Sequence, residues 1–306
     1  MASRPLAPGL YLVGTPIGNL EDITLRALRV LRGVDRVLCE DTRETAHLLA
    51  HYEIHAPMQS CDEHKEQACA ADAVTRVRAG ERLALVTDAG LPGISDPGAR
   101  VAAAVAAAGL PVVPVPGANA ALTALVGSGL AAEHFLFCGF LPSKGGARRT
   151  ELERLKAMVA AGGEPLTLVF YEAPHRILEM LDDVAGIWGE PCPVVLAREL
   201  TKLHEEFLRG GVAEVRAQLA ERERVRGEMV VLVEARPGVA AAAGDEPVAA
   251  LVARLMKDDG LSEKDALKRA ARERGMGKSE VYREWTRRPG RRAGGICRPG
   301  GRADGA

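Results

Sequence analysis

Residues 83–98 read LALVTDAGLPGISDPG. The consecutive apolar residues at the start predict a strand over Leu83–Thr87 that is covered on both faces of a parallel sheet. The loop that follows, Asp88–Gly98, holds two aspartates, three glycines and two prolines. Such loops line the ligand crevice of an open α/β sheet, where glycine lets the backbone approach a ligand. The stretch predicts a small-molecule site, followed by a helix with Asp96 as its N-cap and Pro97 in its first turn.

Two further loops of this kind follow strand-like apolar runs. They read GTPIGN at residues 14–19 and PVPGANA at residues 114–120. Strands and helices alternate through about residue 130, which indicates a mostly parallel sheet. The first loop lacks the G-x-G-x-x-G dinucleotide fingerprint, and the chain has no P-loop motif. An enzyme with a small-molecule site built largely from backbone is therefore the leading interpretation.

From Phe135 onward, strands follow one another with fewer helices between them. Strands are expected over 135–140, 166–171, 194–198, 206–209 and 229–234, with helices near 147–161, 175–188 and 212–222. The consecutive strands near 194–209 indicate a mixed or antiparallel sheet. We therefore expect an N-terminal α/β domain over 9–130, a second α/β domain over 131–236, a basic helical module over 246–288 and a disordered tail over 289–306. The helices of the module are expected near 247–258, 262–274 and 278–286.

The composition is typical of a cytoplasmic globular protein. Of the 306 residues, 47% are hydrophobic and 26% charged, and the N-terminus lacks the long apolar core of a signal peptide. The cysteines form no disulfide framework, and His47, His51 and His55 lack further ligands, so no metal is expected. The uncharged segment 101–132 is broken by glycines and prolines, which indicates a buried α/β core and no membrane span.

Charge is unevenly distributed along the chain. The formal net charge is −1, yet residues 251–306 carry 15 Lys and Arg against 8 Asp and Glu. A basic end on a mildly acidic body suggests a polyanionic partner, although a solvated basic tail explains the pattern equally well. Aromatic residues make up only 4%, which disfavours an aromatic platform for stacking nucleobases.

Three motifs in the second half of the chain add to the three loops described above. They read FYEAPHR at 170–176, ARELTK at 197–202 and GEM at 227–229. In this order the loops and motifs resemble the tetrapyrrole-methylase superfamily, and within it the bacterial enzymes that methylate a cytidine 2′-oxygen in small-subunit rRNA. The resemblance covers about residues 9–235, with 264–285 similar to the family's C-terminal helical piece. It implies a two-domain α/β fold, with a parallel-sheet N-terminal domain and a mixed-sheet second domain that completes the cofactor cleft, plus a small C-terminal helical module.

The same resemblance implies which residues bind S-adenosylmethionine and which face the acceptor. The cofactor positions are Asp88, Ala89, Gly90, Ile94, Ser95, Pro116, Gly117, Ala118, Tyr171, Ala197, Gly227, Glu228 and Met229. The acceptor side is bordered by the first loop and by residues 40–43, and the expected RNA contacts there are Thr15, Pro16, Asn19, Asp41 and Arg43. The family acts on the decoding centre of the assembled 30S subunit and forms homodimers, so both are expected here.

Methyl transfer from a sulfonium needs no metal, but a ribose hydroxyl must lose its proton as it attacks, so one general base is expected. The candidates are His64, Glu199 and Lys202. Glu199 has the best location, on a loop beside an expected cofactor contact. A structural ion pair of Glu199 with Arg198, Lys202 or Arg176 is the competing interpretation.

The basic loop 143–149 is expected to neutralise RNA phosphates. Its candidates are Lys144, Arg148 and Arg149, joined by His175 and Arg176 from the FYEAPHR motif. A solvated helix start is the alternative. The C-terminal helices are interpreted equally well as an rRNA-docking module or as a basic cap on the body. Two other functions stay open: a tetrapyrrole or corrinoid-precursor methylase, and a non-catalytic ribosome-binding factor.

Overall fold

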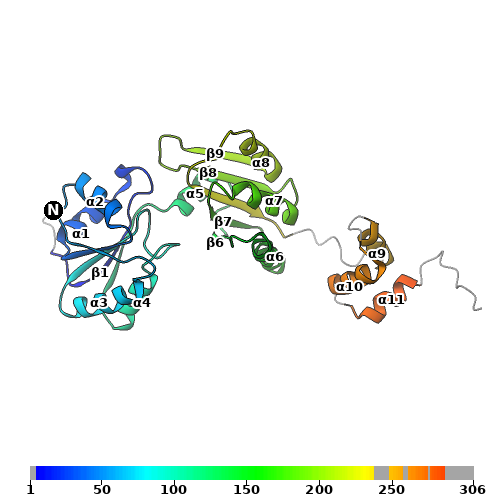
Figure 1. The fold of residues 1–306 in the computed structure, drawn as a ribbon, viewed down its shortest axis with the longest axis horizontal. Coiled ribbons are helices and arrows are strands. Elements are labelled where there is room, and N and C mark those ends of the chain that lie inside the picture. Colours follow the sequence, from blue (N-terminus) through cyan, green and yellow to red (C-terminus); the bar gives the residue numbers. More distant parts are fainter. Residues whose placement is uncertain (1–4, 238–247, 258–260, 275, 287–306) are drawn as a thin grey trace, which may run out of the picture. The chain divides into compact units, whose positions relative to one another are not determined.

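The computed structural model describes residues 5–237, 248–257, 261–274 and 276–286. The chain forms two compact units, Met1–Pro237 and Gly238–Ala306. The first unit contains two sheets with their helices, and the described part of the second contains three helices (Figure 1). The predicted tail over 289–306 lies outside the described residues, as do residues 238–247 between the predicted second domain and the first helix of the helical module.

The first sheet is parallel throughout, in the strand order β3-β2-β4-β1-β5. Its strands are β1 (Gly9–Val13), β2 (Arg36–Cys39), β3 (Met58–Ser60), β4 (Arg82–Val86) and β5 (Val112–Val115). The helices that accompany it are η1 (Leu20–Asp22, 3₁₀), α1 (Leu25–Gly33), α2 (Thr42–His51), α3 (Glu66–Arg78) and α4 (Ala99–Ala107). In β4, Ala84 and Val86 pack with α1 and α2, whereas Leu83 and Leu85 pack with α3 and α4 (Figure 1). Helices on both faces explain the continuous apolar run.

The second sheet is mixed, in the strand order β6-β7-β10-β8-β9. Its strands are β6 (Phe135–Phe140), β7 (Leu166–Glu172), β8 (Pro193–Arg198), β9 (Glu206–Gly211) and β10 (Met229–Ala235). β6 and β7 run parallel, and the other neighbouring strands run antiparallel. One face packs against α6 (Gly145–Gly162), α7 (Ile177–Trp188) and α8 (Val212–Ala220). The prediction of a mixed sheet in this half of the chain is confirmed.

The other face of the second sheet is covered by α5 (Ala120–Ser128). Its buried residues Ala121, Ala124 and Leu125 pack against β7, β8 and β10. This helix follows β5 of the first sheet and lies inside the segment 9–130, yet it contributes to the core of the second sheet.

The start of α4 corrects one prediction. Asp96 is not the N-cap, because the helix begins at Ala99 and Gly98 occupies the cap position with a φ of +127°. The buried carboxylate of Glu66, on α3, accepts hydrogen bonds from the backbone N–H of Gly98 at 2.8 Å and of Arg100 at 3.0 Å. A carboxylate from a neighbouring helix thus replaces the local cap, and the side chain of Asp96 takes no part in it.

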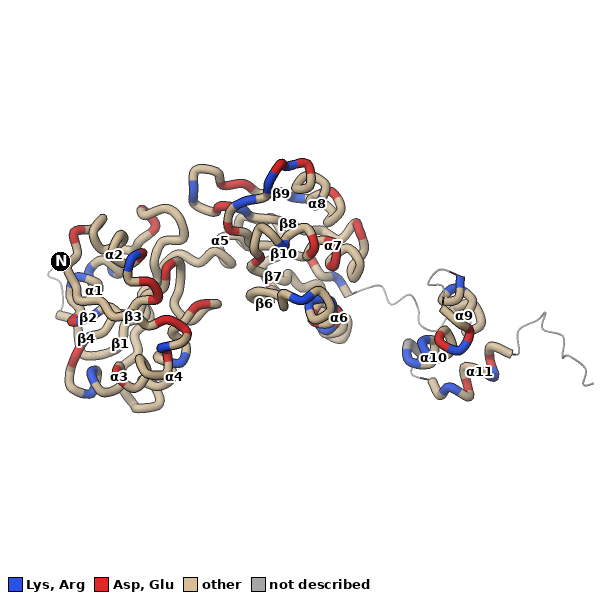
Figure 2. The backbone as a smooth tube through the Cα atoms, viewed as in Figure 1, with Lys and Arg blue, Asp and Glu red and all other residues tan. Residues whose placement is uncertain are grey.

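The second unit has its own small core. Its helices are α9 (Val248–Lys257), α10 (Glu263–Arg274) and α11 (Lys278–Thr286), close to the predicted bounds. Trp285 and Val281 of α11 are buried with Leu251 and Leu255 of α9 and Ala270 of α10. Lysines and arginines, among them the exposed Lys264, Lys268 and Arg272, lie along α10 (Figure 2). In both units, no helix of the described residues is long and apolar enough to span a membrane.

Candidate functional site

A cavity of about 350 Å³ in the first unit, called here the loop cavity, is lined by residues of the loops and strand ends of both sheets. Nine predicted cofactor positions line it: Ala89, Gly90, Ile94, Ser95, Tyr171, Ala197, Gly227, Glu228 and Met229. Of the remaining predicted positions, Asp88 lines a smaller cavity, and Pro116, Gly117 and Ala118 line neither. The structure therefore gathers loops that are far apart in the sequence around one small-molecule cavity.

Glycines in these loops serve two different purposes. Gly90 lines the loop cavity with a φ of +86°, a conformation that L side chains rarely adopt. Gly14 and Gly117 instead let two loops touch, because a Cβ atom on Gly117 would lie only 2.7 Å from the Cα of Gly14. At Gly14 and Gly117, the absence of a side chain therefore allows the two backbones to approach each other closely.

Several residues that line the loop cavity were not predicted as site residues. They include Ile17, Leu91, Asp96, Asn119, Phe140, Glu172 and Leu200. The Phe140 ring packs edge-on against Tyr171 with centroids 5.7 Å apart, at the ends of the neighbouring strands β6 and β7. The pairing of these strand ends was the signal that would have included Phe140. Burial and the charge of Asp88 raise the pKa of Asp96 to about 6.

The predicted bases Glu199 and Lys202 are joined in one ion-pair network at the edge of the loop cavity. Lys202 Nζ lies 2.9 Å from Glu199 Oε1 and 2.9 Å from a carboxylate oxygen of Glu228. Glu199 also accepts a hydrogen bond from the backbone N–H of Glu228 at 2.9 Å. This bond and Lys202 lower the pKa of Glu199, while the two carboxylates raise the pKa of Lys202 against the effect of burial. The competing interpretation, a structural pairing of Glu199 with Lys202, therefore describes this arrangement.

His64 lies apart from this network. It is exposed in the turn before α3 and lines neither the loop cavity nor the smaller one. Arg198 and Arg176, the other partners considered for Glu199, bind Glu206 and Glu172 instead.

The smaller cavity, of about 200 Å³, adjoins the loop cavity. Thr15 and Pro16, predicted on the acceptor side, line it together with Thr87 and Asp88. Ala89 and Gly90, the next residues of the same loop, line the loop cavity, and Thr15 pairs with Gly90 in an isolated bridge. The two cavities therefore share a wall formed by these two loops.

The other predicted acceptor residues have local structural roles. Asn19 caps η1, and Asp41 caps α2 by accepting a hydrogen bond from Arg43 N. Asp41 also forms an ion pair with Arg43 at 2.6 Å, which lowers its pKa to about 2. The Arg43 side chain is 84% exposed, so it is an accessible cation on this side of the loop.

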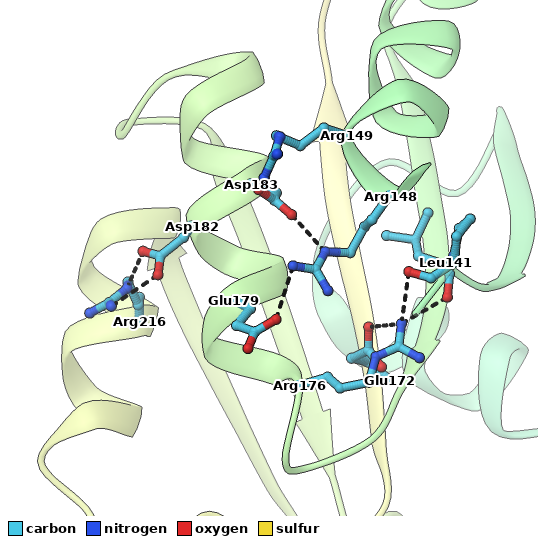
Figure 3. A network of polar contacts seen from close by, with 10 residues as sticks. Leu141, Arg148, Arg149, Glu172, Arg176, Glu179, Asp182, Asp183 and Arg216 are labelled. Carbon is cyan, nitrogen blue, oxygen red and sulfur yellow. Dashed lines mark hydrogen bonds and ion pairs between the residues drawn. The ribbon is translucent and has the colours of Figure 1, made fainter. Parts of the chain in front are cut away.

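Two predicted phosphate contacts, Arg148 and Arg176, have guanidinium groups that are bound to partners inside the protein (Figure 3). The side chain of Arg148 is 3% exposed, and it binds Asp183 at 2.6 Å and Glu179 at 3.2 Å. Arg176 donates to the carbonyl oxygen of Leu141 at 2.7 Å and binds the buried Glu172. Both arginines fasten helix α7 and its preceding loop to neighbouring segments.

The remaining basic candidates stay at the surface. Lys144 and His175 are exposed, and the side chain of Arg149 is 58% exposed although it lies 3.3 Å from Asp183. Lys144 and Arg149 are close in sequence to Arg148 at the start of α6, and His175 directly precedes Arg176 in the loop before α7. Lys144, Arg149 and His175 are the part of the predicted basic set that solvent can reach.

Comparison with solved structures places this architecture. Diphthine synthase aligns with a TM-score of 0.57 at 15% identity, covering 74% of this chain and 89% of that chain. A cobalt precorrin-4 methyltransferase aligns with a TM-score of 0.53 at 18% identity, covering 73% of this chain and 93% of that chain. The family model of tetrapyrrole (corrin/porphyrin) methylases matches residues 9–216. The fold and site thus define a methyltransferase of the tetrapyrrole-methylase class.

Sequence comparison narrows the class. Ribosomal RNA small subunit methyltransferase I of Bacillus subtilis is 42% identical over 277 residues, covering 89% of this chain and 92% of the relative. The enzyme of the same name from Escherichia coli O157:H7 is 43% identical over 275 residues, which cover 90% of this chain and 93% of the relative. The chain belongs to the ribosomal RNA small subunit methyltransferase I family. The predicted fold class, family and enzyme class, an S-adenosylmethionine-dependent methyltransferase, are confirmed.

The residues of the loop cavity fit S-adenosylmethionine. A volume of about 350 Å³ lies within the usual range of small-molecule sites. The walls are mainly apolar, as an adenosine requires, and Asp96 is one of the residues that line the cavity. One solved neighbour with this fold, a uroporphyrin-III C-methyl transferase from Thermus thermophilus, is in complex with S-adenosyl homocysteine. Within the described part of the chain, no three His, Cys, Asp or Glu side chains gather as metal ligands would.

Proposed function

We propose that this protein transfers the methyl group of S-adenosylmethionine to the ribose 2′-oxygen of a cytidine in 16S rRNA, at the decoding centre of the 30S subunit. The observation that carries the proposal is the coincidence of one cavity with nine positions predicted for the methyl donor. The names of the relatives, which are small-subunit rRNA methyltransferases, support the class of acceptor.

The protein's task in such a reaction is to position two reactants. S-adenosylmethionine supplies the electrophilic methyl group, and an in-line displacement needs the acceptor oxygen held close to that carbon. We assign Ala197 and residues 227–229 to the adenosine, and the loop 88–95 to the remainder of the donor. The walls of the loop cavity are mainly apolar, which suits the adenosine of the donor.

We assign the acceptor nucleotide to the smaller cavity, because it shares a wall with the loop cavity. Thr15 and Pro16 stand on one side of this wall and Gly90 on the other. A nucleotide that enters the smaller cavity therefore approaches the donor across the first loop. Asn19, Asp41 and Arg43 border this entrance in our proposal.

The exposed cations supply the contacts to the RNA backbone in this proposal. Lys144 and Arg149 are exposed cations of the first unit, His175 is exposed as well, and each phosphate that a cation neutralises adds salt-dependent affinity. The basic helix α10 is assigned to a second contact with the assembled subunit. We propose the cytoplasm as the location of this activity, because ribosomes are modified there.

We also propose that the protein acts as a homodimer. Leu122 and Val126 lie one turn apart on α5 and are 48% and 79% exposed. Apolar side chains at this spacing form a stripe suited to self-association. Light scattering on the purified protein should give twice the chain mass, and replacing both residues with serine should give the monomer.

The test of the function is methyl transfer from labelled S-adenosylmethionine to 30S subunits from cells that lack the corresponding enzyme. Nucleoside mass spectrometry of the product should show 2′-O-methylcytidine in 16S rRNA. A methylated base without ribose methylation would contradict the proposal. Naked rRNA serves as the comparison, and it should be the poorer acceptor.

Two alternatives would show themselves in the same experiment. Methylation of a corrinoid precursor with no label in rRNA would identify a small-molecule methylase. Ribosome binding without affinity for S-adenosylmethionine would identify a non-catalytic ribosome-binding factor. The exposed cations favour the RNA substrate, since a small acceptor needs none of them.

A further inference from the structure

Asp96 occupies an unusual position in the loop cavity. It lies between β4 and α4, it is half-buried, and it is one of the residues that line the cavity together with Ile94, Phe140 and Tyr171. The preceding residue, Ser95, has a φ of +64°, a left-handed conformation that costs a non-glycine residue on the order of 1 kcal/mol. The chain thus adopts a strained turn directly before a half-buried carboxylate.

Asp96 differs from the neighbouring carboxylates in its partners. Glu172 and Glu228 also line the loop cavity, and they bind Arg176 and Lys202. Asp88 accepts a hydrogen bond from the backbone N–H of Asp41 at 3.1 Å. Among the described residues, none forms a hydrogen bond or ion pair with the Asp96 carboxylate, and it caps no helix there.

The charged form of the Asp96 carboxylate is destabilised in this setting unless a cation binds beside it. Burial removes water from the charged form, and the negative charge of Asp88 opposes it further, which raises the pKa to about 6. A ligand that brings a positive charge beside Asp96 relieves both effects. A neutral ligand of the same shape relieves neither.

We propose that Asp96 is the counter-ion of the donor's sulfonium, so that the site binds the cationic donor in preference to the neutral thioether product. The inference rests on the proposed function, which makes S-adenosylmethionine the ligand of this cavity. The donor carries the sulfonium charge, and S-adenosylhomocysteine is the same molecule without the methyl group and that charge.

The reaction itself then removes the positive charge with which Asp96 interacts. When the acceptor oxygen attacks, the new bond joins oxygen to the methyl carbon, and the electron pair of the broken carbon–sulfur bond returns to sulfur. The hydroxyl proton leaves to a base, and the sulfonium becomes an uncharged thioether. Asp96 is left without its partner, which favours release of the product.

Isothermal titration calorimetry at pH 7.5 tests this inference with two ligands and two variants. In Asp96→Asn we expect the Kd of S-adenosylmethionine to rise about 10- to 30-fold, the range expected when a charge pair is removed, and that of S-adenosylhomocysteine to change less than about twofold. The matched control is Asp62→Asn, which removes a carboxylate that lines neither cavity. It should change neither Kd. An analogue with an amine in place of the methyl sulfonium should behave as the donor does.

The results separate this inference from the function on which it rests. An equal loss of affinity for donor and product would assign Asp96 to a part that both ligands share and would overturn the proposal. Unchanged affinity for both would overturn it as well, with the function intact. A wild-type protein that binds neither ligand would defeat the proposed function and this inference together. Asp96→Asn removes a charge that burial already disfavours, so it should fold, and its melting curve checks that.

Discussion

Arg148 donates a hydrogen bond from its Nε to Oδ2 of Asp183 at 2.6 Å, and this pair ties α6 to α7 inside the protein (Figure 3). The two side chains are 3% and 10% exposed. Replacing Arg148 leaves the buried Asp183 with only the longer contact to the exposed Arg149, at 3.3 Å, and Glu179 without its cation. Arg148→Ala should therefore lower the free energy of unfolding by about 3–5 kcal/mol, measured by urea denaturation.

Arg149 is the matched control for Arg148, because it is the next residue of the same helix and its side chain is 58% exposed. Arg149→Ala together with Lys144→Ala should change stability by less than about 1 kcal/mol. The double variant should bind 30S subunits more weakly, and the slope of its salt dependence should be shallower by about one unit for each phosphate that it no longer neutralises. An unchanged salt slope would remove these cations from the RNA interface.

Much of the fold could be predicted from local patterns, because helices cover both faces of β4 and therefore require the apolar run at Leu83–Val86. Interaction partners that are distant in sequence could not be predicted in this way. The Asp-Pro pair at 96–97 has the local form of a helix start, yet Glu66, from another helix, caps α4. Arg148 looked like a surface cation because its partners lie on α7, more than 30 residues away.

Strand β3 and the role of α5 show the same limit. Met58–Ser60 has only three half-buried residues, too few for an alternating pattern to appear. The sequence alone does not show which sheet α5 covers, because that depends on the tertiary arrangement. Nine of the predicted positions line the loop cavity, because their loops follow strands whose ends converge in this fold.

Glu199 is expected to position the loop at 227–228, since it accepts the backbone N–H of Glu228 and binds Lys202. Glu199→Ala should raise the KM for S-adenosylmethionine about tenfold, or about 1.4 kcal/mol, with a much smaller effect on kcat. Steady-state kinetics on 30S subunits separates the two constants. A collapse of kcat at unchanged KM would instead make Glu199 the general base. His64→Ala, at an exposed position outside both cavities, should leave both constants as they are.

The close approach of Gly14 and Gly117 leaves no room for a side chain. A Cβ atom on Gly117 would lie 2.7 Å from the Cα of Gly14, and neither backbone can move aside without disturbing the loops. Gly117→Ala should cost about 1–3 kcal/mol of stability and weaken donor binding at the adjoining cavity. Gly186→Ala is the control, because a Cβ atom at that position in α7 would meet no other part of the described chain within 4 Å. It should stabilise the protein by about 0.5–1 kcal/mol, and equal effects of the two changes would contradict the packing argument.

Asp96 should make the unliganded protein less stable at neutral pH. Its pKa in the folded protein, about 6, is above the value of 3.8 for an unperturbed aspartate, because of burial and the charge of Asp88. Glu40 and Tyr171 are the other titratable groups near it, and the charge of Asp96 contributes to raising the pKa of both. Its stabilising contribution is therefore complete below pH 3.8 and is lost as the pH rises through about 6. The melting temperature of Asp96→Asn should exceed that of the wild type above about pH 6, and the difference should shrink toward about pH 4.

Glu206 should show the opposite dependence on pH. Arg222 and Arg198 bind its carboxylate and lower its pKa from 4.5 to about 2 against the effect of burial. Its contribution to stability is then present above pH 4.5 and lost as the pH falls toward about 2. Glu206→Gln should cost about 1–3 kcal/mol at about pH 7, and its stability should approach that of the wild type in acid. Urea denaturation between about pH 3 and pH 7 measures the difference. A constant gap between the two proteins over that range would mean that the arginines do not hold this carboxylate in its charged form.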